Sequence, residues 1–171
     1  RINLNTGDVE VLGIVDGAIG IGMTFSPDGK QLAFVRRLER THVDYLEIID
    51  TESGQVMLSF SKEGLSFGSL VWLASGESLI IGVSQTEFQR NTPIYLYQVN
   101  VDGTDLVQLT DLAEQVRYPI FAPNGEWITF VSYSLDSSDP SSTLYIMNPD
   151  ATNRRRLTDN AIGWPSWSID G

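Results

Sequence analysis

Short stretches of alternating hydrophobic and polar residues follow one another along this chain of 171 residues, each after a turn signal. After Gly29, apolar residues stand three and five positions later, at Leu32 and Phe34. The same offsets recur in two later segments, at Leu79 and Ile81 and at Ile128 and Phe130. This period-two alternation is typical of strands. No stretch keeps an apolar period of about 3.6 residues, so the pattern predicts an all-β fold with essentially no helix.

The turn glycines recur at a nearly constant spacing of 47, 49 and 46 residues, at Gly29, Gly76, Gly125 and Gly171. An aromatic residue stands four positions before each of them, at Phe25, Trp72, Phe121 and Trp167. Pro, Asp, Asn and Ser, the residues that tight turns require, surround these glycines. Each repeat is therefore predicted to begin with a β-hairpin.

The second half of each repeat has the pattern strand, turn, strand. These pairs of segments are 45–50 with 55–58, 94–100 with 106–110, and 144–148 with 155–158. The same half-unit opens the chain at residues 2–5 and 9–12. Four antiparallel strands in each repeat of about 45–49 residues favour a β-propeller over a sandwich, because each blade covers the apolar face of the next.

With the strands of a blade labelled A to D outward from the propeller axis, the chain divides into five parts. They are strands C and D of a partial blade (1–16), three whole blades (17–62, 63–113 and 114–160) and strand A of a further blade (161–171). This makes about 3.5–4 blades, fewer strands than a closed ring requires. We therefore expect an open fragment of a larger ring, whose exposed edges could support self-association.

The motifs resemble those of the TolB-like propeller repeats, the Pro-Asp relatives of the WD repeat. The first half of that repeat is matched by TFSPDGKQLAF at 24–34, by PIFAPNG at 119–125 and by WPSWS at 164–168. The second half is matched by LYIMN at 144–148 and by the LTD segments at 109–111 and 157–159. The resemblance covers nearly the whole chain. It implies a propeller that is usually periplasmic or extracellular, often binds proteins and has no common catalytic residues.

Composition excludes several classes of function. The net charge of −11 repels phosphate backbones and anionic lipid surfaces, so no nucleic-acid partner is expected. The absence of cysteine excludes disulfides, thiol catalysis and Cys-ligated zinc. No apolar run reaches the length of about 18–20 residues that a membrane span needs, so no membrane insertion is expected.

Strand connectivity places the A–B and C–D turns on one end of the propeller, here called the turn face. Much of the acidic charge lies there, for example at Asp28, Asp102 and Asp150. Asp and Asn tolerate the dihedral angles of tight turns, so turn chemistry explains most of these residues. The alternative is a surface for a cation or a basic partner.

The opposite end, here called the loop face, carries the B–C loops and the links between blades. Its segments are the longest and least repetitive, and binding residues concentrate on loops held by a rigid scaffold. A protein partner is therefore expected at this face, against the alternative of solvated connectors. The candidate residues are Arg36, Arg37, Arg40, His42, Gln85, Glu87, Phe88, Arg90, Tyr133, Asp136 and Asp139.

Catalytic and cofactor signals are weak. His42 is the single histidine, and the chain has no Gly-x-Ser-x-Gly elbow to present a nucleophile. Asp136 and Asp139 lack the spacing of a calcium loop. We expect neither a cofactor nor a metal, and we interpret the four tryptophans, Trp72, Trp127, Trp164 and Trp167, as core residues rather than as a sugar-stacking platform.

The sequence thus favours a non-catalytic propeller scaffold for protein–protein interaction. Two alternatives stay open. The first is the propeller that gates a prolyl-oligopeptidase-like serine hydrolase, and the second is an extracytoplasmic sensor domain of a signalling protein.

Overall fold

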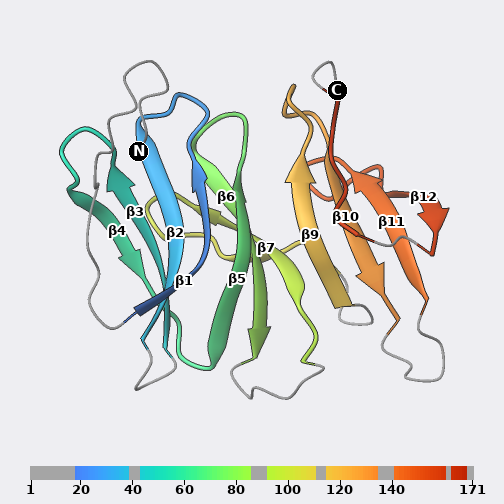
Figure 1. The fold of residues 1–171 in the computed structure, drawn as a ribbon, viewed down its shortest axis with the longest axis horizontal. Helices are drawn as coiled ribbons and strands as arrows, with labels where there is room; N and C mark the ends of the chain where they lie inside the picture. Colours follow the sequence, from blue (N-terminus) through green and yellow to red (C-terminus); the bar gives the residue numbers. More distant parts are fainter. Residues whose placement is uncertain are drawn as a thin grey trace.

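A computed structural model describes residues 18–38, 43–85, 92–110, 115–134, 141–160 and 163–168, with side chains from residue 22 onward. The described residues form twelve strands and no helix (Figure 1). Within these ranges, nothing has the length and apolarity of a membrane-spanning helix.

The strands follow one another in the order that the repeats predict. They are β1 (Ala18–Phe25), β2 (Gln31–Leu38), β3 (Asp44–Asp50), β4 (Val56–Phe60), β5 (Leu65–Trp72), β6 (Ser78–Gln85), β7 (Tyr95–Asn100), β8 (Val107–Gln108), β9 (Gln115–Phe121), β10 (Ile128–Tyr133), β11 (Ser142–Met147) and β12 (Arg155–Asp159).

Three four-stranded antiparallel sheets result, each with its strands paired in sequence order: β1 to β4, β5 to β8, and β9 to β12. The first strand of the middle sheet, β5, packs against both β1 and β9, so the three sheets stand in a row (Figure 1). This arrangement confirms the all-β, blade-like architecture. The blade boundaries, including the partial blades at the two ends, stay predictions.

The A–B turns have the geometry that their sequence predicts. Gly29, Gly76 and Gly125 have φ values of 72°, 73° and 72°, a left-handed conformation in which a side chain is unfavourable. In the first turn, the Ser26 hydroxyl donates to the Asp28 carboxylate, and the backbone N–H of Gln31 donates to the Ser26 hydroxyl oxygen. The hairpin therefore rests on short-range hydrogen bonds.

The hydrophobic core lies between the sheets. Leu79 and Ile81 on β6 pack toward the first sheet, in a cluster with Val35 and Leu46. Their neighbour Ile80 packs toward the third sheet. Both faces of β6 are thus buried, because the middle sheet is covered on each side by a neighbour.

The interpretation of all four tryptophans as core residues is wrong for Trp164. Trp72 is buried and Trp167 half-buried, but Trp164 is 78% exposed. Trp164 stands three residues before Trp167, which is the position that Ser69 occupies relative to Trp72. Ser69 is exposed as well, so a side chain at this repeat position can lie outside the core. Trp127 is half-buried on the turn face.

Candidate functional site

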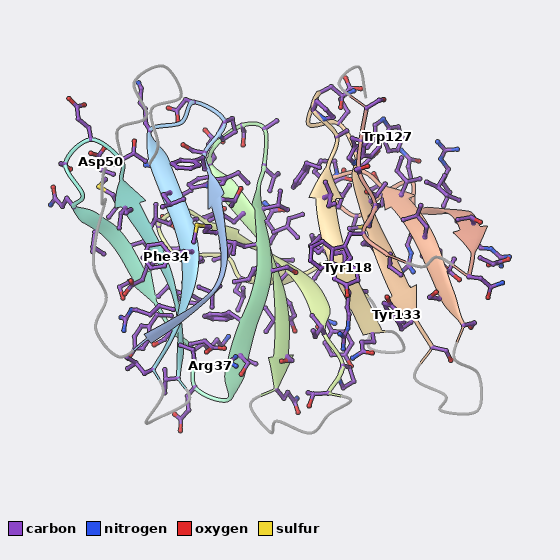
Figure 2. The ribbon with its side chains drawn as sticks, viewed as in Figure 1. Phe34, Arg37, Asp50, Tyr118, Trp127 and Tyr133 are labelled. Carbon is purple, nitrogen blue, oxygen red and sulfur yellow. The ribbon has the colours of Figure 1, made fainter. Side chains whose placement is uncertain are left out.

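The second strands of the three sheets bring candidate residues to one end of the molecule. Arg37, Gln85 and Tyr133 stand at or next to the ends of β2, β6 and β10. Figure 2 shows Arg37 and Tyr133 at the end opposite to Asp50 and Trp127. The remaining candidates on this loop face lie outside the described residues: Arg40, His42, Glu87, Phe88, Arg90, Asp136 and Asp139.

Arg36 is engaged within its own sheet. Its Nη2 atom lies 2.6 Å from Oε1 of Glu47, which also accepts a hydrogen bond from the Ser59 hydroxyl. Its guanidinium lies over the Tyr45 ring, 4.7 Å from the centroid. The hydrogen bond to Glu47 raises the pKa of Arg36 above its ordinary value. The charge of Arg36 is therefore balanced inside the first sheet.

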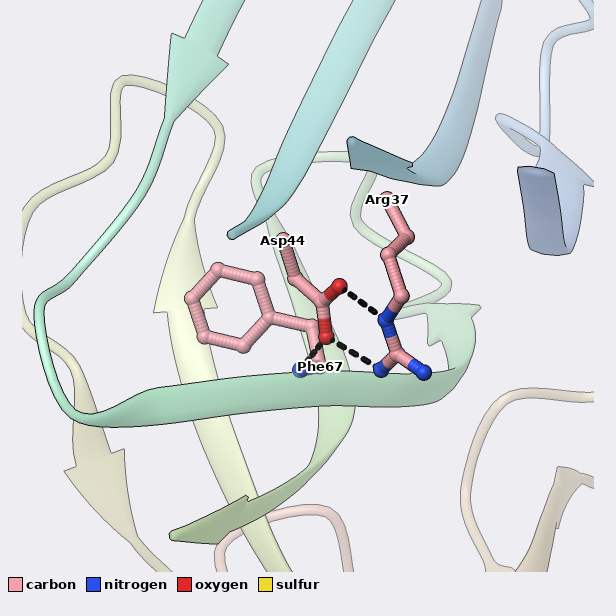
Figure 3. Close-up of polar contacts among 3 residues, drawn as sticks. All are labelled: Arg37, Asp44 and Phe67. Carbon is pink, nitrogen blue, oxygen red and sulfur yellow. Dashed lines mark hydrogen bonds and ion pairs between the residues drawn. The ribbon is translucent and has the colours of Figure 1, made fainter. Parts of the chain in front are cut away.

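Arg37 belongs to a polar contact between the first two sheets, shown in Figure 3. Its guanidinium makes a bidentate pair with Asp44, with N–O distances of 2.6 and 2.7 Å. Oδ2 of Asp44 also accepts the backbone N–H of Phe67 on β5 at 2.9 Å. The Asp44 side chain is fully buried, and the hydrogen bond between Arg37 and Asp44 raises the pKa of Arg37 above its ordinary value. These contacts indicate that Arg37 helps to hold β3 against β5.

Tyr133 belongs to a cluster of aromatic and cationic side chains, here called the aromatic cluster. It is formed by Arg117, Tyr118 and Tyr133 on the third sheet and by Trp164 of the segment 163–168. The Arg117 guanidinium lies 5.9 Å from the centroid of the Tyr133 ring. The rings of Tyr118 and Trp164 are 5.5 Å apart. Partial burial and the nearby Tyr118 hydroxyl raise the pKa of Tyr133, while Arg117 opposes the shift. Trp164 gives the cluster a large exposed apolar surface.

Sequence reasoning missed Tyr118 and Trp164 as candidates. Both stand three residues before the repeat aromatic, where the first two repeats have Gly22 and Ser69. The change from small to aromatic residues at this repeat position is the sequence signal that could have identified them as candidates. Tyr118 lies in the β-bulge where two residues of β9 oppose Phe130, and it has a φ of 57°, which is rare for an aromatic residue. Backbone strain of this kind clusters at functional sites.

The acidic turn residues use their carboxylates within their own turns. Oδ1 of Asp102 accepts the backbone N–H and the hydroxyl of Thr104, and Asp150 does the same with Thr152. These hydrogen bonds lower the pKa values of Asp102 and Asp150. This is the role that turn chemistry predicts. The part of the chain that the structure describes holds no group of three or more potential metal ligands.

Comparison with known proteins supports the fold. No family model matches the sequence. An uncharacterized protein of Agrobacterium fabrum is 28% identical over 156 residues, which cover 86% of this chain and 50% of that protein. The chain thus spans about half the length of this curated relative.

Solved structures show the same architecture. A putative TolB from Agrobacterium tumefaciens matches with a TM-score of 0.73 at 24% identity, over 94% of this chain and 57% of that one. A chain of a nidogen/laminin complex matches with a TM-score of 0.71 at 17% identity, over 98% and 59%. A prolyl endopeptidase matches with a TM-score of 0.64 at 14% identity, over 93% and 25%. The chain has the TolB-like β-propeller fold.

Proposed function

Proceeding from this fold, we propose that the chain is a non-catalytic propeller scaffold that binds a protein partner at its loop face and needs no cofactor. The aromatic cluster carries the proposal. Tryptophan, tyrosine and arginine dominate the binding energy of protein interfaces. Arg117 lies against Tyr133, and Trp164, which is 78% exposed, lies against Tyr118.

The connections between strands support the same face. The A–B turns have 5, 5 and 6 residues, whereas 5, 9 and 8 residues separate the second from the third strand of the three sheets. The A–B turns are therefore nearly uniform in length, whereas the B–C loops vary, as expected where loops on a rigid frame make specific contacts. The fold is shared with a putative TolB and with a chain of a nidogen/laminin complex.

Site-specific photo-crosslinking in the full protein tests the proposal. A photoreactive residue at Gln85 or Tyr133 should capture a partner, whereas the same residue at Gln55 or Thr104 on the turn face should not. Trp164→Ala should then weaken the purified complex at least about tenfold, as expected for a hot-spot residue. Leu157→Ala removes another exposed apolar side chain, on β12, and should leave affinity unchanged. Equal crosslinking from both faces would contradict the proposal.

The similarity to a prolyl endopeptidase favours a second candidate, the gating propeller of a serine hydrolase. A fluorophosphonate probe distinguishes the two, because it labels an activated serine in a hydrolase and leaves a scaffold unlabelled. Labelling of the full protein at a serine outside this chain would favour the hydrolase.

The resemblance to TolB-like repeats also leads us to propose a periplasmic or extracellular location. Cell fractionation of the source organism tests it. Self-association through open propeller edges stays a prediction that sedimentation analysis can check.

A further inference from the structure

In the first two sheets, the A–B turn is tied to the C–D turn by a backbone hydrogen bond. The N–H of Thr51 donates to the carbonyl of Lys30 at 2.9 Å. In the second sheet, the N–H of Val101 donates to the carbonyl of Glu77 at 3.1 Å. The two turns are thereby held together at the turn face.

The third sheet cannot form this bond. The residue at the position of Thr51 and Val101 is Pro149, which has no N–H. Pairing between the second and third strands begins at Gln31 with Asp50 in the first sheet and at Ser78 with Asn100 in the second. In the third sheet it begins one residue later, at Ile128 with Met147. The proline therefore shortens the ladder where the two turns meet.

A shallow groove of about 610 Å³, open to solvent along most of its length, lies at this place. Trp127 occupies the position of Gln31 and Ser78, so an aromatic ring replaces a small or flexible polar side chain. The lining residues are Glu126, Trp127, Asn148, Pro149, Asp150 and Asn153.

The polar groups of the groove both accept and donate hydrogen bonds. Glu126 contributes a carboxylate, and Asp150 contributes Oδ2, since its Oδ1 accepts within the turn. The amides of Asn148 and Asn153 contribute oxygens and N–H groups, of which one Asn148 N–H already donates to the Thr152 hydroxyl oxygen at 2.9 Å. A fitting ligand therefore presents several hydroxyl groups, which donate and accept, together with an apolar face for the Trp127 ring.

We propose that this groove binds a neutral saccharide. Sugar hydroxyls supply the donors, and the apolar face of a pyranose ring can pack on Trp127. The Arg155 guanidinium lies 5.9 Å from the centroid of the Trp127 ring. Because the protein itself supplies a cation at this ring, a cationic ligand is disfavoured. The carboxylates of Glu126 and Asp150 repel an anion.

The proposed site is independent of the proposed protein interface. Figure 2 shows Trp127 and Tyr133 near opposite ends of β10. A saccharide can therefore bind whether or not a partner binds at the loop face.

Calorimetric titration of the full protein with maltotriose, cellotriose and triacetylchitotriose tests the proposal. At least one of these sugars should bind, and Trp127→Gln, which introduces the residue of the first sheet, should weaken that binding at least about tenfold. Met57→Gln, the control at an exposed apolar side chain on β4, should leave it unchanged. The proposal is overturned if none of the three sugars binds, or if Met57→Gln weakens binding as much as Trp127→Gln.

A second variant tests the part played by the missing N–H. Pro149→Thr restores the backbone N–H that Thr51 provides in the first sheet. The A–B and C–D turns of the third sheet should then be joined by a hydrogen bond, which narrows the groove. Sugar binding should weaken without loss of thermal stability. Unchanged affinity in a folded Pro149→Thr protein would overturn the assignment. Binding of choline or of a proline-rich peptide that depends on Trp127, without sugar binding, would overturn it as well.

Discussion

Asp44 shows how a single residue can join two sheets. Its carboxylate is completely buried, yet each of its oxygens is used, by the Arg37 guanidinium from its own sheet and by the Phe67 N–H from the next. Removing one partner of such a pair leaves an uncompensated charge in the interior, which costs more than the intact pair contributes.

Asp44→Ala should therefore lower the free energy of unfolding by about 3–5 kcal/mol, because it removes the bidentate pair with Arg37 and leaves the buried Phe67 N–H without this acceptor. Urea denaturation measures this change. Gln85→Ala, an exposed residue on the same loop face, should change stability by less than about 0.5 kcal/mol. An equal effect of the two substitutions would show that the contact between β3 and β5 does not stabilise the fold.

The turn aspartates predict a pH dependence. The pKa values of Asp28, Asp50, Asp102 and Asp150 lie below their ordinary value, because each carboxylate accepts hydrogen bonds from its own turn. Such groups contribute stability above the unfolded pKa of about 3.9, and the contribution is lost as pH falls through the folded value. Carbon-13 NMR titration should give these lowered pKa values, and Asp102→Asn should make stability less dependent on pH below about pH 4. Ordinary pKa values would contradict the turn geometry.

At the scale of elements, the repeated hairpins differ in what surrounds them. Gly29 and Gly125 have the same φ of 72° at equivalent positions. A Cβ atom built on Gly29 meets nothing within 4 Å, whereas one built on Gly125 collides with the Cβ atom of Ala74 in the neighbouring turn. Substituting each glycine by alanine therefore distinguishes two contributions to the loss of stability. One is the strain of a side chain on a left-handed backbone, and the other is the clash with a neighbouring blade.

Gly29→Ala should cost about 1–2 kcal/mol of stability, the penalty for an L-residue in the left-handed region. Gly125→Ala should cost about 1–3 kcal/mol more, because the added methyl group overpacks the contact with Ala74. Thermal unfolding of the two variants gives the comparison. If Gly125→Ala is no less stable than Gly29→Ala, the third turn does not pack against the second as described.

Across the whole molecule, stability comes from sheets that cover one another. Two tryptophans at the same repeat position hold neighbouring units together. The indole N–H of Trp72 on β5 donates to the carbonyl of Thr24 on β1 at 3.0 Å. The indole N–H of Trp167 donates to the carbonyl of Ile120 on β9 at 3.2 Å. The segment 163–168 therefore stands against β9 as β5 stands against β1.

Trp72→Phe should destabilise the protein by about 1–2 kcal/mol, because it removes the hydrogen bond between two sheets at a buried position. Trp167→Phe should cost less, since Trp167 is only half-buried. Chemical denaturation of both variants measures the difference. A larger effect at Trp167 would contradict this ranking of the two contacts.

Much of the fold could be predicted from residue order, because its signals are local. The turn glycines, the preceding aromatics and the period-two alternation each act over a few residues, and together they predict sheets of four antiparallel strands. The candidate site was less predictable. The role of Arg37 at a partner surface stays a prediction, whereas its pair with Asp44 was not foreseen, because the further bond of Asp44 to Phe67 joins residues 23 positions apart.

Turn chemistry and alternation are properties of neighbouring residues, so the order of residues alone predicts the hairpins, the repeat and the need for each sheet to be covered. Which side chains meet across sheets depends on how the sheets pack. The tertiary structure placed Trp164 against Tyr118 and left a groove where Pro149 cannot donate a hydrogen bond. These features depend on contacts between segments far apart in the chain, and no local pattern encodes the distance between them.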